Sequence, residues 1–476
     1  MKEKWIKVSI IIITILLFMG TLLPYNYPSD IYNIIILGFK GYANTWFMTS
    51  GRTICSIVFY LFDYFNISLK SGIVILKILS IVISSSTIYI FYNLIIHVTN
   101  IKNKKLEYFI LFPIILIFIN YSSYEYFYYT ESAIMWLGLL MVVLALKVFL
   151  NNGKNKYLKI FFCLFLAINC YQATILFYIP GLFLQLLLQK KDYKVITKEL
   201  FYNSLIVLIN LVLGYIIVIT ARYFIDFEPF QSVVLHISII NYLRRFIYLI
   251  ILFYGSFPNL VVLIVLLIVT MYLVLEIKEK RIRIIVNLLL IWLIGLAEVL
   301  TLVELTSFYA ADRIIFSYVS SMGMVLVYAL SISNRKLIFV SISGLLLISQ
   351  IINSNSISID SRKTREEDKV YGKIISEMVK EYEEKNNIKL KKIEYCFDNS
   401  PTRGYKGLRK TTEPTCRGFC GSWIMDNIFN YYCKNHNFTK KYNQGIYRTK
   451  FKSKEWDEFS KEQIIFENDT IYFCIY

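Results

Sequence analysis

The chain has 476 residues, of which 57% are hydrophobic, 17% aromatic and only 18% charged, and its mean hydropathy is +0.54. A water-soluble chain of this length would need about a quarter of its residues charged to cover its domains, so the composition excludes a soluble protein. The net charge of +18 would suit a nucleic-acid partner only if the basic residues shared one soluble face, and they do not.

Residues 1–352 consist of apolar segments separated by short charged or Gly/Asn-rich breaks. Each segment predicts a helix, because only a helix satisfies its own backbone hydrogen bonds in lipid. Some of them are shorter than the ~20 residues of a full crossing, and the pair around residues 170–172 predicts a short hairpin that does not cross fully. In another, 246–275, we expect an outer-surface helix followed by a span. The predicted segments, about eleven, are 8–24, 73–96, 107–120, 133–150, 160–170, 174–189, 200–221, 246–275, 284–303, 314–331 and 337–352.

Lysines and arginines occur in every second connection between these segments, and the positive-inside rule makes those connections cytoplasmic. The intervening connections, and the chain from residue 353, then face outward. The sequence therefore predicts a multi-pass plasma-membrane or inner-membrane protein with a cytoplasmic N-terminus, a lipid bilayer around it and no nucleic-acid partner. The predicted outward connections are 25–72, 121–132, 171–173, 222–245 and 304–313.

The last part of the chain is polar and predicts a second domain. We expect a polar linker over 353–361 between a transmembrane domain, 1–352, and an extracytoplasmic domain, 353–476. Helical and alternating patterns predict helices over 365–385 and 423–432 and strands over 392–397 and 470–476. The fold class is thus an all-α polytopic membrane protein with a small C-terminal α/β domain, which we interpret as a lid.

Five of the eight cysteines lie in this C-terminal domain. Outside the cytoplasm disulfides form readily, and the two predicted strands would bring Cys396 and Cys474 near each other. A second pattern has spacing that could ligate zinc. We favour structural disulfides over zinc, and either over catalysis. The four candidate zinc ligands are Cys416, Cys420, Cys433 and His436.

Two ionisable residues in the first outward connection could do chemistry. Asp30 could accept a proton from a hydroxyl group, and Arg52, after Gly51, could hold a phosphate in its forked geometry. Between them, residues 34–39 and 42–47 predict helices on the membrane surface. The alternative interpretation is an ordinary exposed aspartate and an arginine that contacts lipid headgroups.

A long outer loop directly after the first span, with an acidic residue and then surface helices that end in Gly-Arg, resembles the GT-C class of membrane glycosyltransferases. Within that class the chain is most similar to the GtrII-like glucosyltransferase family, and the Tyr171-Gln172 step between two short apolar segments supports this. The resemblance implies an enzyme that moves a hexose, such as glucose, from a polyprenyl-phosphate donor to a glycan acceptor, a cell-surface polysaccharide. It implies Asp30 as the catalytic acidic residue. Ser29 precedes Asp30 where a second acid would stand, so a divalent metal cofactor stays open.

Further candidates follow from the same reading, each with an alternative. Arg313 and Arg222 could hold the donor phosphate or anchor the chain at the interface, since arginine snorkels readily. The aromatic run 121–131 could bind sugar or form an interfacial belt. Lys77 and Lys147 are expected to snorkel from span ends. The candidate substrate-binding residues are Glu125, Glu131, Tyr171, Gln172 and Glu298.

Two other functions fit this composition. A polysaccharide polymerase or ligase would use the same lipid-linked donors but usually centres on a large late outer loop, whereas here the large loop is the first one. A flippase or transporter of lipid-linked sugars predicts charged residues in mid-span and broken helices near the midplane.

Overall fold

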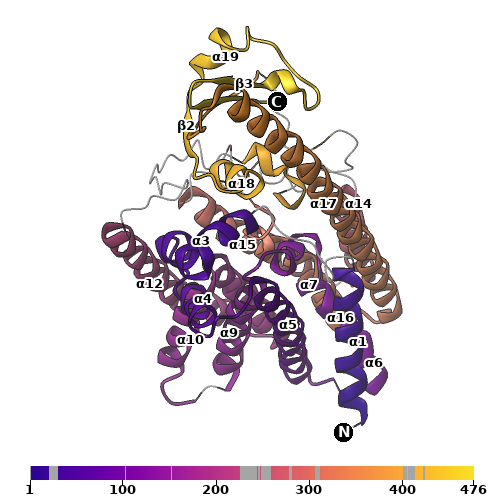
Figure 1. The fold of residues 1–476 in the computed structure, drawn as a ribbon. Coiled ribbons are helices and arrows are strands. Elements are labelled where there is room, and N and C mark those ends of the chain that lie inside the picture. Colours follow the sequence, from indigo (N-terminus) through magenta and orange to yellow (C-terminus); the bar gives the residue numbers. More distant parts are fainter. Residues whose placement is uncertain are drawn as a thin grey trace. The chain divides into compact units, whose positions relative to one another are not determined.

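The computed structural model describes residues 2–20, 30–101, 103–151, 153–225, 244, 247, 259–277, 281–305, 311–399, 405, 413–421 and 424–476. The protein is mostly helical, with a four-stranded sheet in its C-terminal part (Figure 1). Within the described residues it forms two compact units. Unit 1 comprises Met1–Gly20, Ala43–Leu61 and Lys70–Ser354, and unit 2 comprises Thr21–Tyr42, Phe62–Leu69 and Asn355–Tyr476.

Unit 1 is built from apolar helices and contains most of the helical residues. A π-helical turn, η1 (Ala43–Met48), and two 3₁₀ turns, η2 (Tyr121–Tyr124) and η3 (Gln172–Phe177), interrupt them. The α-helices that lie in it wholly or mainly are α1 (Lys2–Met19), α4 (Thr53–Tyr64), α5 (Leu69–Thr99), α6 (Lys104–Phe109), α7 (Leu111–Phe118), α8 (Glu125–Tyr128), α9 (Ser132–Asn151), α10 (Lys156–Cys170), α11 (Tyr178–Leu188), α12 (Tyr193–Ile225), α14 (Asn259–Glu276), α15 (Arg281–Leu305) and α16 (Phe316–Ile332).

Five described helices are long and apolar enough to cross a membrane, namely α5, α9, α12, the 281–300 part of α15, and α17 (Lys336–Asn386). A sixth span arises if Lys104–Phe118 and Tyr121–Tyr128, bent by 65°, form one broken span. The prediction of a mostly helical protein is confirmed, and these long apolar helices favour a multi-pass membrane protein. Several other predicted segments form shorter apolar helices, and α1 carries four charges in its first six residues.

The short hairpin expected around residues 170–172 corresponds to α10, of 15 residues, followed by the apolar helix Gln172–Leu188. The apolar helix α4 was not predicted, because it lies inside the connection that the charge pattern assigns to the outer face. The outer helix expected at the start of 246–275 lies mostly outside the described residues, and α14 begins at Asn259.

The polar linker predicted over 353–361 is wrong, because α17 continues through it as one helix of 51 residues. The polar residues of this stretch are mainly small, and Ser354, Ser358 and Ser361 are fully buried. Ser354 Oγ donates to the carbonyl oxygen of Phe18 at 2.8 Å. A serine whose hydroxyl is satisfied in this way packs inside a helical bundle, so a run of serines does not end a helix here.

Unit 2 contains α3 (Ile31–Tyr42), part of α17, α18 (Met425–Tyr432), α19 (Gly445–Thr449) and one sheet. Its strand order is β2-β1-β4-β3. The central strand β1 (Lys392–Phe397) pairs in parallel with β2 (Thr439–Tyr442) and β4 (Thr470–Ile475), and β3 (Ile464–Glu467) pairs antiparallel with β4. Both predicted strands are confirmed. The predicted helix over 423–432 is α18, although residue 423 lies outside the described residues.

Helix α3, which lies within the first predicted outward connection, packs on the C-terminal part of the chain. The hydroxyl oxygens of Tyr32 and Tyr432 lie 3.1 Å apart, and Asn427 Nδ2 donates to Asn33 Oδ1 at 2.8 Å. The predicted surface helices 34–39 and 42–47 are α3, kinked at Gly38 with φ of 71°, and η1. Residues 30–42 therefore belong to the same unit as the sheet.

A fully buried carboxylate ties α17 to the loop before α18. Asp368 accepts hydrogen bonds from Arg365 Nη1 at 2.6 Å, Tyr405 Oη at 2.7 Å and the backbone N–H of Gly418 at 2.9 Å. A buried carboxylate is tolerated only when its oxygens are paired in this manner. This network fixes residues 413–421 against the helix.

Candidate functional site

The site begins with a break in the helical backbone over residues 119–132. The side chain of Asn120 accepts from the N–H groups of Ser122 and Ser123 at 3.1 and 3.3 Å, and the Ser123 hydroxyl accepts from the Asn120 N–H. This capping box starts the short turns η2 and α8 before α9 begins at Ser132. Every side chain over 121–132 is buried. The interfacial-belt interpretation of these aromatic residues is therefore wrong, because their rings pack inside the protein.

Lys77 of α5 satisfies the carbonyl groups that this break leaves open. Its ammonium donates to the carbonyl oxygens of Tyr128 at 2.9 Å and Tyr129 at 3.5 Å, and also to that of Phe127. A cation at the C-terminal end of a short helix replaces the missing backbone donors. Lys77 is 6% exposed, so the expectation that it snorkels is wrong, whereas Lys147 is exposed.

Arg313, in the turn before α16, pairs with Glu125 of α8. Its Nη1 lies 2.8 Å from Glu125 Oε2, and its backbone N–H donates to the same oxygen at 3.1 Å. Arg313 Nη1 also donates to the Tyr129 hydroxyl at 3.1 Å, and its Cζ lies 4.7 Å from the Tyr129 ring centroid. The Glu125 side chain is 1% exposed and that of Arg313 is 11% exposed, so this ion pair is shielded from water.

Arg52 immediately precedes α4 and pairs with Glu131. Arg52 Nη1 lies 2.9 Å from Glu131 Oε1, and Arg52 Cζ lies 4.8 Å from the ring centroid of Tyr171. The side-chain exposures are 20% for Arg52 and 9% for Glu131. This second pair has the same composition as the first: one arginine, one glutamate and one tyrosine face.

Two further predicted residues hold the backbone that carries Arg52. Gln172 Nε2 donates to the carbonyl oxygen of Ser50, and Arg222 Nε donates to that of Thr49 at 3.1 Å. Gly51, the residue between Ser50 and Arg52, has φ of +73°, and a Cβ atom added there would lie 2.7 Å from Val218 Cγ2. Only glycine fits this turn without strain. Gln172 and Arg222 therefore position Arg52 through its backbone.

The two pairs form one group. Arg52 and Arg313 are close enough to repel each other electrostatically, and each of them interacts electrostatically with Tyr171. Tyr126 bridges them, because its ring meets Tyr171 edge-on at 6.0 Å and its hydroxyl donates to the Arg313 carbonyl at 3.3 Å. We call this group the paired-arginine cluster. It consists of Lys77, Arg313, Arg52, Glu125, Glu131, Tyr126, Tyr129 and Tyr171.

The cluster has spare hydrogen-bonding capacity. Arg52 Nε and Glu125 Oε1 are buried and have no hydrogen-bond partner among the described residues. The same holds for the hydroxyls of Ser122 and Thr130 in the adjoining turns. Buried polar atoms are nearly always satisfied, by protein or by a bound molecule. The cluster can therefore offer both donors and acceptors to a polar ligand. Its formal charge, from three cations and two carboxylates, is 3 − 2 = +1.

Four predicted site residues are not members of the cluster: Gln172 and Arg222, which hold the turn before Arg52, and Asp30 and Glu298. Asp30, the predicted catalytic acid, belongs to unit 2, at the start of α3, where its carbonyl oxygen accepts from the N–H of Asn33 at 3.0 Å. Glu298 is half-buried on α15, and no hydrogen bond within the described residues joins it to the cluster. The sequence analysis considered Tyr126 and Tyr129 only as members of the aromatic run 121–131, and it did not include Lys77 among the site residues, although a lysine inside an apolar run could have indicated it.

The four candidate zinc ligands do not gather at one point. Cys416 and Cys420 lie side by side, but His436 Nε2 is held by Glu383 Oε1 at 2.8 Å. In the described parts of the chain, no group of three or more His, Cys, Asp or Glu residues could hold a metal ion. In the cluster, each carboxylate is paired with an arginine.

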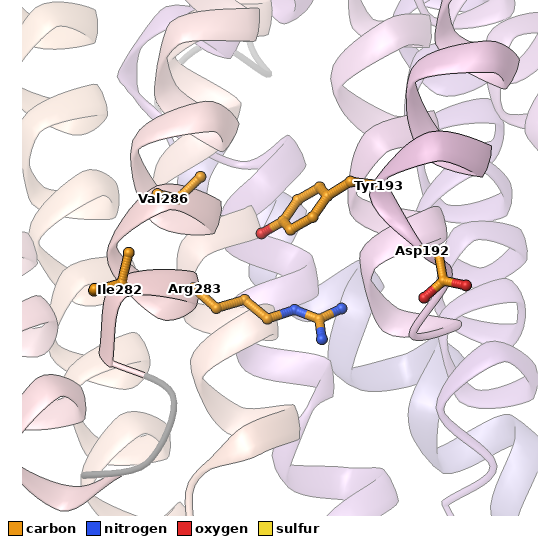
Figure 2. Close-up of a pocket in the computed structure, with 5 residues that line it drawn as sticks. All are labelled: Asp192, Tyr193, Ile282, Arg283 and Val286. Carbon is orange, nitrogen blue, oxygen red and sulfur yellow. The ribbon is translucent and has the colours of Figure 1, made fainter.

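A cavity of about 390 Å³ opens between the start of α12 and the start of α15. Figure 2 shows Arg283 and Tyr193 extending toward each other across it, and Arg283 Cζ lies 5.4 Å from the Tyr193 ring centroid. Its other lining residues are Asp192, Ile282 and Val286. None of the cluster residues lines this cavity, and the cavity lies next to connections that the charge pattern predicts to be cytoplasmic. The predicted residues converge on the cluster and not on this cavity.

A scan of protein-family models and a search of curated proteins find no match to this chain.

Proposed function

We propose that the chain is a membrane glycosyltransferase of the GT-C type, which moves a hexose such as glucose from a polyprenyl-phosphate donor to a cell-surface polysaccharide. The observation that carries the proposal is the paired-arginine cluster. Arg52 and Arg313 come from distant parts of the chain, and each is backed by a glutamate and a tyrosine ring. Most of the candidate donor-binding and substrate-binding residues meet at this cluster or at the turn that supports it.

The cluster suits the phosphate of such a donor. A sugar linked to a lipid through one phosphate is a phosphodiester with a single negative charge, which matches the formal charge of +1. When the sugar leaves, the lipid phosphate gains negative charge, and fixed guanidinium groups stabilise that developing charge. The buried surroundings strengthen this effect, because water does not screen the charges.

The remaining roles follow from the same resemblance. Asp30 would accept the proton of the acceptor hydroxyl, so that the hydroxyl oxygen displaces the lipid phosphate directly. The packing of α3 on α18 supports a common location for Asp30 and the C-terminal unit on one side of the membrane. Replacing Asp30 with Asn is expected to abolish transfer at normal protein level, and unchanged glycosylation in that variant would remove this role.

Binding of polyprenyl phosphate, the expected leaving group, tests the cluster itself. Lysine at position 52 or 313 keeps the charge but loses the guanidinium fork, so Arg52→Lys and Arg313→Lys should weaken binding by about 10- to 100-fold, given ~1.5–3 kcal/mol for a charge-assisted hydrogen bond. The matched control is Arg283→Lys, because Arg283 also stacks on a tyrosine of unit 1. Equal affinities for all three variants, at equal thermal stability, would contradict the assignment.

A second candidate, a flippase or transporter of lipid-linked sugars, is favoured by one observation. The helical segments Lys104–Phe118 and Tyr121–Tyr128 are bent by 65° at a short break, and the buried Lys77 binds the carbonyl groups exposed there. Broken helices that surround charged side chains are typical of transporters. The two functions differ in outcome, since a transporter moves the intact donor across a vesicle membrane, whereas the enzyme splits it.

A further inference from the structure

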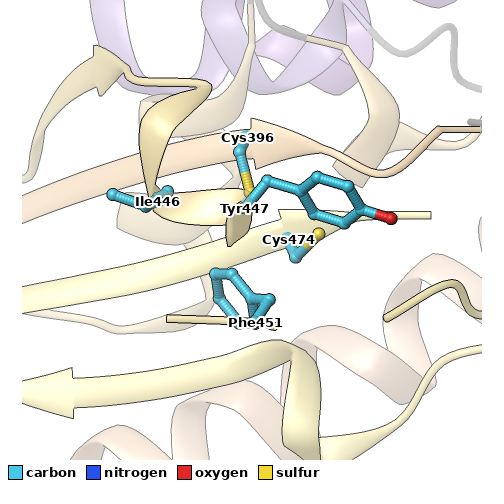
Figure 3. Packing of buried hydrophobic residues seen from close by; sticks show 5 residues of the cluster. All are labelled: Cys396, Ile446, Tyr447, Phe451 and Cys474. Carbon is cyan, nitrogen blue, oxygen red and sulfur yellow. The ribbon is translucent and has the colours of Figure 1, made fainter. Parts of the chain in front are cut away.

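Two pairs of cysteines come together in unit 2. Cys396 on β1 and Cys474 on β4 are register partners in neighbouring parallel strands, and both are fully buried. Their thiols are within hydrogen-bonding reach of each other. Figure 3 shows them in a small core with Ile446, Tyr447 and Phe451. Side chains at register partners point to the same face of a sheet, so the two sulfur atoms face each other across one strand spacing.

The second pair lies in the turn before α18. Cys416 Sγ and Cys420 Sγ are 3.9 Å apart; Cys416 directly follows the 3₁₀ turn η5 (Glu413–Thr415), and Cys420 is the last residue of the 3₁₀ turn η6 (Gly418–Cys420). Cys416 is buried, whereas Cys420 is partly exposed. Arg365 Nη2 donates to the Cys416 carbonyl oxygen, so the Asp368 network described above holds this turn in place.

We propose that unit 2 carries two disulfides, a structural one between Cys396 and Cys474 and an exchangeable one between Cys416 and Cys420. Neighbouring strands lie about 4.7–4.9 Å apart, inside the Cα separation of about 4.4–6.8 Å that a disulfide spans. The turn pair needs only a change of side-chain rotamers, because its sulfur atoms are already in contact. This inference rests on the predicted extracytoplasmic location of unit 2 and not on the proposed enzymatic activity.

The chemistry requires an oxidant of the thiol–disulfide class, such as the disulfide of an oxidoreductase. One cysteine thiolate attacks the oxidant's disulfide and forms a mixed disulfide, and the second thiolate then displaces the oxidant's sulfur. One S–S bond forms in the chain and one breaks in the oxidant, which leaves with two thiols. Two electrons move to the oxidant in each exchange.

The two pairs differ in when they can react. The hydrogen bond with Cys396 and burial raise the pKa of Cys474, and the hydrogen bond that Cys416 donates to Cys420, together with burial, raises the pKa of Cys416. Raised pKa values disfavour the reactive thiolate. The fully buried strand pair must therefore be oxidised before the sheet closes, and it then resists reduction. In the turn pair, by contrast, the residue Cys420 is partly exposed.

Peptide mapping of the full-length protein, purified from membranes without reductant and alkylated with N-ethylmaleimide, tests both pairs. Trypsin separates all four cysteines: Cys396 lies in 393–403, Cys474 in 462–476, Cys416 in 411–417 and Cys420 in 418–434. We expect 393–403 linked to 462–476, and 411–417 linked to 418–434. Because 418–434 also contains Cys433, the mapping is repeated on Cys433→Ser, where the second link should persist.

Mild reductant applied to the folded protein should free the turn pair for alkylation and leave the strand pair linked. The proposal is overturned if all four cysteines are alkylated without reduction, if Cys433 is linked to any of them, or if the strand pair is the first to open. These outcomes do not depend on any sugar transfer.

A variant series measures the contribution of the strand disulfide to stability. Cys474→Ser should lower the Tm of unreduced protein by roughly 5–10 °C. The substitution removes a cross-link that closes a loop of 474 − 396 = 78 positions and so restricts the unfolded chain. The control is Cys433→Ser, another buried cysteine, whose thiol pKa burial raises to about 12. If Cys474→Ser lowers the Tm of unreduced protein no more than Cys433→Ser does, the strand pair is not a disulfide.

Discussion

At the scale of single residues, Gly51 determines where Arg52 lies. Its backbone has φ of +73°, and an added Cβ would lie 2.9 Å from Gln172 Nε2 as well as against Val218. We expect Gly51→Ala to lower the free energy of unfolding by about 1–3 kcal/mol and to weaken polyprenyl-phosphate binding by shifting the guanidinium.

The control for this change is Gly344→Ala, at a helical glycine of α17 with no heavy atom within 4 Å of the added Cβ. That substitution should be neutral or stabilising by about 0.5–1 kcal/mol. Thermal unfolding in detergent compares the two variants. Similar Tm values for both would show that the turn at Gly51 is not constrained as the structure indicates.

Lys77 provides a second test at the residue scale. Lys77→Met keeps the aliphatic stem but leaves the carbonyl groups of residues 127–129 without their cation, so we expect a marked fall in Tm, since each buried group left unpaired costs about 1–3 kcal/mol. Lys147→Met removes an exposed lysine of α9 and should leave the Tm nearly unchanged. If the two variants behave alike, Lys77 reaches solvent as the sequence suggested.

At the scale of secondary-structure elements, β1 shows where local sequence reasoning succeeds, and α17 shows where it fails. The alternating pattern over 392–397 predicts β1 correctly, because a half-buried strand imprints its period of two on the sequence. The run of Asn and Ser over 353–361 is typical of a loop, but tertiary packing overrides that local signal. Burial of the small hydroxyl side chains, such as Ser358, cannot be read from the run itself.

The continuity of α17 can be tested with a proline. Ile359 is 45% exposed in the middle of the predicted linker, so Ile359→Ala should cost little. Ile359→Pro should cost about 3 kcal/mol or more, because it removes a helical hydrogen bond and clashes with the preceding turn. Thermal unfolding and limited proteolysis between 353 and 361 measure the effect. Equal stability of the two variants would mean that the segment is a loop.

At the scale of the whole molecule, the composition predicts a membrane protein. The helical and alternating residue patterns predict the C-terminal α/β unit. The inventory of site residues was also largely present in the sequence, since Arg52, Arg313, Glu125 and Glu131 were each identified separately. Their pairing was not predictable, because Arg52 and Glu131 are 79 positions apart and Arg313 and Glu125 are 188 apart. No local period relates such residues; only the packing of the helices brings them together.

The most direct test of the proposed function is cleavage of the donor. Full-length protein is incubated with a panel of polyprenyl-phosphate sugars and a polysaccharide acceptor, and released polyprenyl phosphate is measured. The account predicts release from at least one hexose donor, normal release by Arg283→Lys, and about 100-fold slower release by Arg313→Ala, which corresponds to ~3 kcal/mol of lost leaving-group stabilisation. Transport of intact donor across vesicle membranes, with no lipid phosphate released from any member of the panel, would contradict it.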